Sequence, residues 1–381
     1  MNQNIFRTPL CDMLGIEFPI MLAAMAPDIS DPQLTAAVSE AGGIGVLACA
    51  DKDPDQIIAL ASETRKLTKK PFGIDIGLPA RVETYGHNYQ EAVSKANLPK
   101  QYVKMRDDFL EKMGIPFDDN TNNATPGMSS VASFKLGETF SRSQVKAIFQ
   151  TRPALFVSAL GDPSFMVAEA HARGIKVMSL VGKAKDAINI ARGGVDAIIC
   201  TGTAAGGHSG DVDGMVLVPH VAESVSPIPV VAGGGIVDGR GLAAALALGA
   251  IGVWVGTRFI ASDECSAPAW YKQRLVEAGD TATVRSKWYT GKTCRHLRSE
   301  WDNAWDISGL SALPMPEQAL LTTPMALGAA RVGRYVESGI FCGQGVARIK
   351  SIMPVHEIIS NLINEAREIL MSDIHKRLRL N

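Results

Sequence analysis

The chain has 381 residues, of which 46% are hydrophobic and 20% are charged, and its formal net charge is -1. This composition is typical of a globular protein with a large core, and it excludes the strongly basic face that a nucleic-acid partner would require. Apolar stretches such as 243–250 are too short to span a membrane, and the N-terminus lacks the apolar core of a signal peptide. We therefore expect a cytoplasmic protein without a membrane or nucleic-acid partner. The scattered cysteines indicate no metal site.

Eight short apolar runs follow one another along the chain, and each is predicted to be a β-strand. They are residues 20–25, 43–49, 72–78, 155–160, 176–181, 197–201, 229–232 and 252–255. The runs are apolar rather than alternating, which is typical of parallel strands covered on both faces. Helical stretches lie between them, at 31–41, 54–68, 163–173, 183–192 and 239–248. Eight strands that alternate with helices predict an α/β fold of the (β/α)8 TIM-barrel class.

An open Rossmann sheet is the competing α/β fold. Its first strand would be followed by a G-x-G-x-x-G turn. The first predicted strand ends instead in Ala24-Met25-Ala26-Pro27, which favours the barrel. The small side chains of Ala24 and Ala26, with Met25 between them, would let a planar cofactor ring approach the backbone at this strand end.

Two regions depart from the repeating pattern. Residues 79–153 are too many for a normal connection between the third strand and the fourth, and they contain a predicted helix at 101–113. The segment leaves the carboxyl end of a strand, where barrel active sites lie, so we expect a lid or substrate-binding insertion. Residues 279–381 contain three tryptophans and end in a helix at 355–370, which predicts a cap packed against the barrel. The whole chain, 1–381, is then a single domain.

The stretch 196–210, DAIICTGTAAGGHSG, reads as a buried strand followed by a glycine-rich loop. Gly206 and Gly207 would leave room for a planar ligand against the backbone. His208 would project from the carboxyl end of the sixth strand. A single histidine is more often structural, but polar residues at the tops of barrel strands are commonly catalytic, so His208 is the candidate acid or base.

Glycines also follow the seventh and eighth predicted strands, at Gly233, Gly234, Gly235 and Gly256, and Thr257 comes next. Backbone N–H groups in such loops, beside a helix N-terminus, form an anion site. Barrel enzymes commonly hold a cofactor phosphate at this pair of strands. The sequence therefore predicts a phosphate site, which a phosphosugar isomerase or synthase barrel would share.

Three segments are distinctive in combination: PIMLAAMAPDISDPQLTAAVSEAGGIGVLA, GVDAIICTGTAAGGHSG and PIPVVAGGGIVDGRGLAAALALGAIGVWVGTRF. Together they resemble the nitronate monooxygenase (2-nitropropane dioxygenase) family of FMN-dependent barrels, and the resemblance spans nearly the whole chain apart from the insertion. The tail segments GKTCRHLRSEWDNAW, LPMP and GQGVARI resemble family members with an enlarged lid. One departure is Ala204, at a position where relatives often carry an acidic residue.

The resemblance implies a bound FMN and a role for several of the candidate residues. His208 is implied as the acid or base beside the flavin. Phosphate contacts are implied for the two glycine loops, at Gly234, Gly235, Gly256 and Thr257. Flavin-ring contacts are implied for residues at the ends of the first and third strands, namely Met25, Ala26 and Asp75.

Two enzyme activities fit this resemblance. In the first, a nitronate-like carbanion is oxidised with O2 through FMN. In the second, NAD(P)H is the co-substrate, and the flavin reduces an enoyl-CoA or acyl-CoA type of substrate or a quinone. Lys292, Arg295 and Arg298 would then hold a phosphate-bearing substrate, or else form a neutralised surface. A non-catalytic flavin-binding regulator is a third alternative, and a homodimer is an open option for the assembly.

Overall fold

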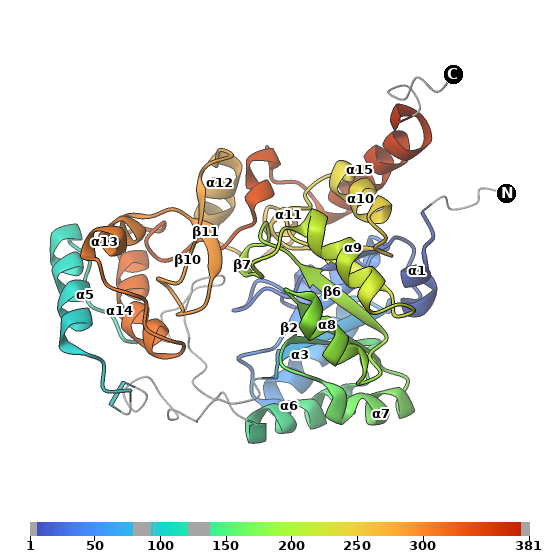
Figure 1. Cartoon of the computed structure of the whole chain (residues 1–381), viewed down its shortest axis with the longest axis horizontal. Coiled ribbons are helices and arrows are strands. Elements are labelled where there is room, and N and C mark those ends of the chain that lie inside the picture. Colours follow the sequence, from blue (N-terminus) through green and yellow to red (C-terminus); the bar gives the residue numbers. More distant parts are fainter. Residues whose placement is uncertain (1–5, 79–92, 95, 121–137, 375–381) are drawn as a thin grey trace.

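A computed structural model describes residues 6–78, 93–94, 96–120 and 138–374 (Figure 1). Its central sheet consists of parallel strands β1 (Ile20–Leu22), β2 (Gly45–Ala48), β3 (Phe72–Gly77), β4 (Leu155–Leu160), β5 (Lys176–Val181), β6 (Ala197–Thr201), β8 (Val230–Gly233) and β9 (Val253–Val255). The strand order is β1-β9-β8-β6-β5-β4-β3-β2. A parallel bridge between Met21 and Ile44 joins the two ends of this order. The sheet therefore closes, and the predicted barrel class is confirmed.

The strand limits agree closely with those expected from the apolar runs. Strands β4, β5 and β6 have the predicted limits, whereas β1 ends three residues early, at Leu22. The chain leaves the sheet there because the backbone N–H of Met25 donates to Ser30 Oγ at 3.0 Å rather than to a neighbouring strand. The turn brings Met25 beside Gly256, at the carboxyl end of β9.

Helices cover the outside of the barrel. They are α2 (Pro32–Glu40), α3 (Pro54–Leu67), α6 (Glu138–Thr151), α7 (Ser164–Ala172), α8 (Ala184–Ala191), α9 (Gly214–Ser224), α10 (Gly239–Ala247) and α15 (Val355–Glu368). The sequence determines the start of α3, where proline occupies the first turn and the N–H of Asp53 donates to Gln56 Oε1 at 2.8 Å. At the opposite end of the chain, α15 packs on α10 and α2.

The two faces of each strand contribute to different parts of the core. Phe72, Ile74 and Ile76 of β3 lie in the large cluster between the sheet and the helices. The alternate residues face the barrel interior, because successive side chains of a strand point to opposite faces. A Cβ added to Gly73 would accordingly contact Leu155, which belongs to the interior cluster. Asp75 therefore projects into the barrel, toward the carboxyl end of β3.

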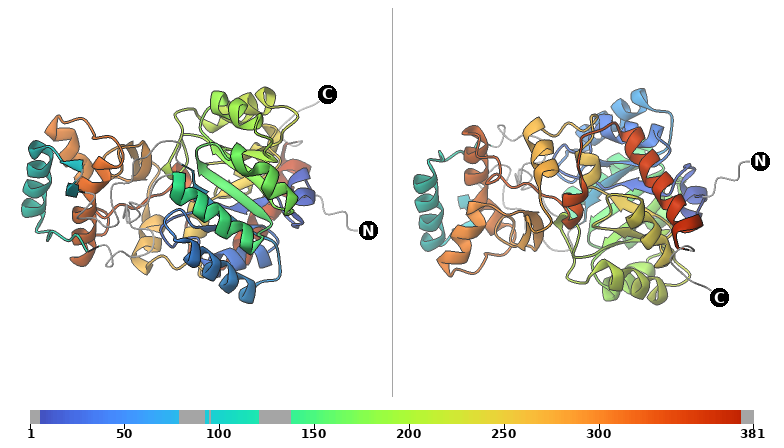
Figure 2. Two further views of the ribbon diagram at one scale, coloured as in Figure 1. Left: turned by 90° about the horizontal axis from the view of Figure 1, so that it is seen from below. Right: turned by 90° about the horizontal axis from the view of Figure 1, so that it is seen from above.

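A second, smaller hydrophobic core lies outside the barrel, and Figure 2 shows it at one end of the molecule. It contains α5 (Lys100–Met113) from the insertion, together with α13 (Glu300–Ser308) and α14 (Glu317–Arg331) from the tail. The rings of Phe109 and Trp301 meet edge to face at 5.0 Å, and Trp288 stacks on Trp305 at 4.9 Å. We call this unit the cap. Segments nearly 200 residues apart in the sequence thus share one core.

A short antiparallel sheet connects the cap to the barrel. It consists of β10 (Thr283–Ser286), β11 (Cys294–Leu297) and the two-residue β7 (Gly207–His208) in the order β10-β11-β7. In β7 and β11, His208 pairs with Cys294 and Gly207 with Arg295. None of these three strands is predicted from the sequence, because two residues show no periodicity and the pairing spans more than 80 residues.

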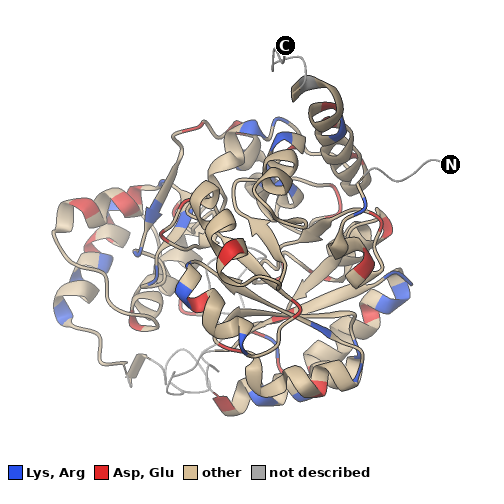
Figure 3. Cartoon of the chain, turned by 45° about the vertical axis from the view of Figure 1, so that its right-hand side comes forward, with Lys and Arg blue, Asp and Glu red and all other residues tan. Residues whose placement is uncertain are grey.

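Both signs of charge are interspersed over the surface in Figure 3. Several charges form pairs one helical turn apart, such as Lys104 with Asp108 at 2.8 Å and Arg173 with Glu169 at 2.6 Å. Such exposed pairs stabilise a helix only slightly. Over the described residues, no helix combines the length and apolarity that a membrane span needs.

The shared core predicts that insertion residues stabilise the cap. Phe109→Ala should lower the free energy of unfolding by about 3–5 kcal/mol, because Phe109 is buried against Trp301. Phe117→Ala is the control: this ring is 50% exposed, and we expect a loss below about 1 kcal/mol. Urea titration followed by tryptophan fluorescence would measure both, and equal losses would contradict a shared core.

Candidate active site

Four loops meet at the carboxyl ends of neighbouring strands. A Cβ added to Gly234, after β8, would lie 2.8 Å from the backbone nitrogen of Ala205, after β6. A Cβ added to Gly256, after β9, would lie 3.3 Å from Sδ of Met25, after β1. The sequence candidates on these four strands therefore gather at one end of the barrel. Asp75 reaches the same end from β3.

The loops after β8 and β9 have the geometry of an anion site. Gly234 and Gly235 adopt φ values of +101° and +75°, a region that favours glycine. Among the described residues, no hydrogen-bond acceptor is found for the N–H groups of Gly234, Gly235 and Thr257. Thr257 also begins the short helix α11 (Thr257–Ile260). Free N–H groups at two adjoining loops suit a phosphate, as the sequence predicts.

The tail segment around Cys342 completes this end of the barrel and explains one glycine differently. A Cβ on Gly206 would lie 2.5 Å from the backbone carbon of Cys342 and 2.6 Å from the nitrogen of Gly343. The missing side chain at Gly206 therefore accommodates the tail rather than a planar ligand. Gly207 has a φ of +64°, and a Cβ there would meet nothing within 4 Å.

Asp75 is a buried carboxyl group with a free oxygen. Its residue is 4% exposed, and Oδ2 has no hydrogen-bond partner among the described residues. Burial raises the pKa of Asp75 well above its usual range, which favours the protonated form of the carboxyl group. A neutral carboxylic acid can donate a hydrogen bond into the barrel mouth, where a polar ligand would satisfy it.

His208 lies in β7 at the edge of the same loops, and its side chain is exposed at the surface of the site. Its Nε2 lies 2.9 Å from Oγ1 of Thr290, a residue of the cap. Desolvation by the surrounding protein, and then the positive charge of Lys292, lower the pKa of His208 to about 4. The imidazole is therefore neutral at physiological pH and can accept a proton.

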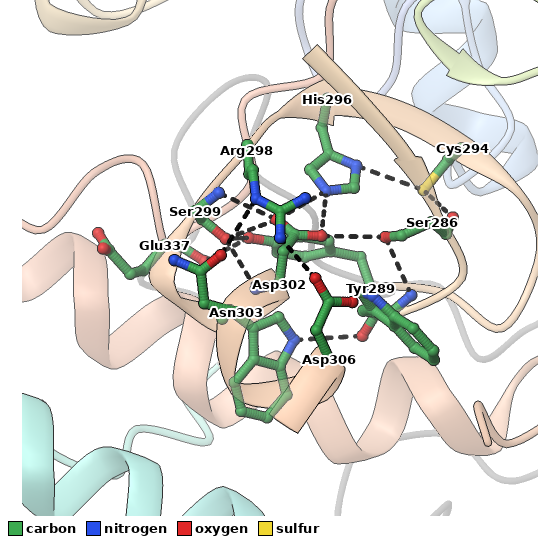
Figure 4. Close-up of polar contacts among 12 residues, drawn as sticks. Ser286, Tyr289, Cys294, His296, Arg298, Ser299, Asp302, Asn303, Asp306 and Glu337 are labelled. Carbon is green, nitrogen blue, oxygen red and sulfur yellow. Dashed lines mark hydrogen bonds and ion pairs between the residues drawn. The ribbon is translucent and has the colours of Figure 1, made fainter. Parts of the chain in front are cut away.

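The basic group suggested by the sequence does not form a single site. Arg295 is buried, and its Nε donates to the carbonyl oxygen of Thr203 at 3.1 Å. Arg298 pairs with Asn303 and Asp306 on α13 (Figure 4). Lys292 is the member of the group that is exposed near His208. A substrate anion could therefore meet Lys292 beside the imidazole.

A buried polar network supports β11 from the cap side (Figure 4). His296 Nε2 lies 3.0 Å from Oδ1 of Asp302, and both side chains are at most 1% exposed. Ser286 Oγ donates to the same oxygen at 3.2 Å, and the Ser299 N–H donates to Oδ2 at 3.0 Å. Burial opposes ionisation of Asp302, but hydrogen bonds from His296 and Ser299 outweigh it, so its pKa is lowered.

Sequence reasoning missed this network and Thr290. Ser299 and Asp302 form a capping box at the start of α13, which the S-x-x-D pattern could have revealed. No local pattern indicates that Thr290 contacts His208, because the two residues lie 82 positions apart.

Comparisons with known proteins show which family the chain resembles in sequence and in fold. The sequence model described as nitronate monooxygenase matches residues 7–365. A Mycobacterium tuberculosis protein named as a monooxygenase is 34% identical over 371 residues, covering 94% of this chain and 96% of that protein. The structure of FabK from Thermotoga maritima has a TM-score of 0.74 at 31% identity, covering 98% and 99% of the two chains. A nitroalkane oxidase from Streptomyces ansochromogenes has a TM-score of 0.78 at 26% identity, covering 95% and 99%.

The Asp302 network predicts how stability depends on pH. Because the folded-state pKa of Asp302 is lowered, its carboxylate stabilises the fold above the usual value of 3.8, and this stabilisation is lost as the pH falls through the folded value. Asp302→Asn should therefore cost about 1–3 kcal/mol at pH 7 and less at pH 3, measured by urea unfolding. Asp306→Asn, whose side chain is 50% exposed, should change little. An Asp302→Asn variant as stable as the parent at pH 7 would contradict this account.

Proposed function

Since the chain belongs to the nitronate monooxygenase family and is a flavin-dependent oxidoreductase, we propose that it binds FMN and oxidises a nitronate-like carbanion with O2. His208 is proposed as the acid or base of this reaction. The observation that carries the proposal is the position of His208. A neutral imidazole lies at the barrel end where two loops present free N–H groups.

The residues at the barrel mouth fit FMN. The free N–H groups of Gly234, Gly235 and Thr257 suit its phosphate, and no carboxylate is among these three residues. When protonated, Asp75 would supply a buried donor for a polar atom of the flavin ring, which would satisfy the unpaired Oδ2. Near the end of β1, Met25 packs over Gly256. We therefore propose the phosphate at β8 and β9, and the ring toward β1 and β3.

The remaining candidate residues from the sequence would shape the site without contacting the substrate. Ala24 is half-buried and Ala26 exposed, and neither side chain is large enough to block a ring beside the strand end. Gly233 ends β8 and directs the chain into the phosphate loop. Gly207 provides the left-handed turn just before His208.

When bound, FMN would supply the redox chemistry that carries electrons from the substrate to O2. The protein's own contribution is to bind the substrate, hold it and move a proton. Because His208 is neutral, its free nitrogen can take the proton that a C–H acid releases as it becomes a carbanion. Lys292 lies close enough to affect His208 electrostatically, and its charge would stabilise the anion.

The cap favours a second candidate activity. Lys292 and Thr290 come from the cap, so a substrate at His208 also faces a unit built from α5, α13 and α14. A surface of that size suits a substrate larger than a simple nitroalkane, such as an enoyl-CoA or acyl-CoA compound or a quinone. NAD(P)H would then be the co-substrate.

An absorbance spectrum of the purified protein tests the proposal directly. Flavin bands that bleach when a nitronate is added without oxygen, but persist with NADH and NADPH, would support nitronate oxidation. Bands that bleach with either nucleotide would favour the reductase. A colourless protein that takes up no FMN would overturn both.

Replacing the imidazole separates cofactor binding from turnover. His208→Asn should keep its FMN but lose about 10²–10⁴-fold in kcat, which is the usual contribution of a general acid or base. His220→Asn is the control, because His220 is exposed on α9. In the parent protein, the acid limb of kcat/KM should lie near pH 4, since His208 is unprotonated above that value. A His208→Asn variant within threefold of the parent would refute its role.

A charge in the phosphate loop tests cofactor placement. Gly234→Asp should lose FMN, because a carboxylate would repel the phosphate. The left-handed backbone and the close approach of Ala205 also strain any side chain there. Gly234→Ala shares that strain without the charge and is the matched control. The FMN content, measured by absorbance, should be much lower in the Gly234→Asp variant than in the Gly234→Ala variant. Equal contents would mean that the phosphate binds elsewhere.

A further inference from the structure

We propose that Thr290 is a positioning residue that holds His208 in the Nε2–H tautomer, so that Nδ1 is the atom that exchanges a proton with the substrate. This inference deepens the proposed function and rests on the role of His208 as acid or base. In this proposal the cap contributes Thr290, which orients a histidine that belongs to the barrel.

The hydrogen bonds of Thr290 determine the direction of its contact with His208. Thr290 is 5% exposed, and its hydroxyl donates to the carbonyl oxygen of Lys292 at 3.1 Å. A threonine hydroxyl has one proton and two lone pairs. The carbonyl oxygen of Lys292 can only accept, so both contacts of the hydroxyl are hydrogen bonds at once only if Oγ1 donates to that oxygen and accepts from His208 Nε2 at 2.9 Å. The Lys292 N–H, 3.3 Å away, donates to the remaining lone pair. This arrangement places the proton of the neutral imidazole on Nε2.

The tautomer determines which atom is free to react. A neutral imidazole has one N–H, so a proton on Nε2 leaves Nδ1 as an acceptor. Within the described part of the chain, Nδ1 of His208 has no hydrogen-bond partner, and the side chain is exposed. The ring is thus held at one nitrogen and open at the other, as a general base requires.

Thr290 can orient a ring because its own position is fixed. Next to it, the Tyr289 hydroxyl donates to the carbonyl oxygen of Glu337 at 3.1 Å. The carbonyl oxygen of Trp288 accepts from Gln318 Nε2 at 2.7 Å and from Thr322 Oγ1 at 3.0 Å. On the other side, β11 is supported by the buried network around Asp302 (Figure 4). The segment that carries the Thr290 hydroxyl is therefore held in place by hydrogen bonds to its neighbours.

The groups facing His208 favour a neutral ring. Lys292, from the same turn as Thr290, disfavours a second proton on the ring. Cys294, opposite His208 on β11, stays a neutral thiol because burial raises its pKa to about 12. Cys342, against Gly206, also has a pKa of about 12 because it is buried, and Arg295 is engaged with Thr203. No carboxylate in the described residues shifts the pKa of His208 upward.

Nitrogen NMR of the FMN-loaded protein, labelled with ¹⁵N-histidine, reads the tautomer without turnover. In the parent protein at pH 7, the His208 signals should be those of a protonated Nε2 and an unprotonated Nδ1. Thr290→Val keeps the shape of the side chain but loses the acceptor, so the signals should shift toward a mixture of tautomers. Thr290→Ser retains the hydroxyl and should restore the parent spectrum. Signals from an Nδ1–H ring, or an unchanged Thr290→Val spectrum, would overturn the proposal.

Kinetics of the same variants separate positioning from a structural effect. Thr290→Val should lower kcat by up to about 10²-fold with little change in KM, and Thr290→Ser should recover most of it. Equal urea midpoints would show that the variants are folded, and an unchanged kcat in Thr290→Val would overturn the positioning role. If His208→Asn remains active while the parent ring carries its proton on Nε2, the proposed function fails but the tautomer assignment stands.

Discussion

The short pairing between β7 and β11 is the interaction on which the rest of the site depends. It joins a loop of the barrel, at Gly207 and His208, to a strand of the cap, at Cys294 and Arg295. Two paired residues stabilise little by themselves. The pairing persists because Arg295 also donates to Thr203, and Arg285 donates to the carbonyl oxygen of Gly210 at 2.9 Å. The orientation of His208 thus depends on the docking of the cap.

Burial sets the charge of the site more than any single ion pair does. Desolvation by the surrounding protein lowers the pKa of His208 and raises the pKa of Asp75 and of the neighbouring thiols, because a low-dielectric surrounding disfavours charged forms. The cation near the imidazole, Lys292, is exposed and can be screened by water. An anionic ligand would then meet backbone N–H groups and one lysine, with little opposing negative charge.

The sequence predicts the barrel well and the cap poorly, for a physical reason. Strands such as β4 and β5 are buried on both faces, so their apolar runs identify them without tertiary information. The glycines after β8 and β9 are also local signals, since positive φ values favour that residue. The contact between Thr290 and His208 depends on how the cap folds over the barrel, and nothing within either segment encodes it. The same limit applies to Arg295 and Arg298, whose charges suggest a ligand but whose partners lie within the fold.

The tail motif GQGVARI carries part of the family resemblance, and the structure shows that its glycines let the tail pack against the candidate site. A Cβ on Gly345 would lie 2.7 Å from the carbonyl oxygen of Gly235, so the tail packs directly against the proposed phosphate loop. The N–H of Gln344 donates to the carbonyl oxygen of Ala204 at 2.9 Å, and the Gly343 N–H donates to Thr257 Oγ1 at 2.8 Å. Position 204 therefore joins the tail to the site through its backbone. Because the backbone makes this contact, it does not depend on the side chain at position 204, and the alanine there places no negative charge beside Gly235.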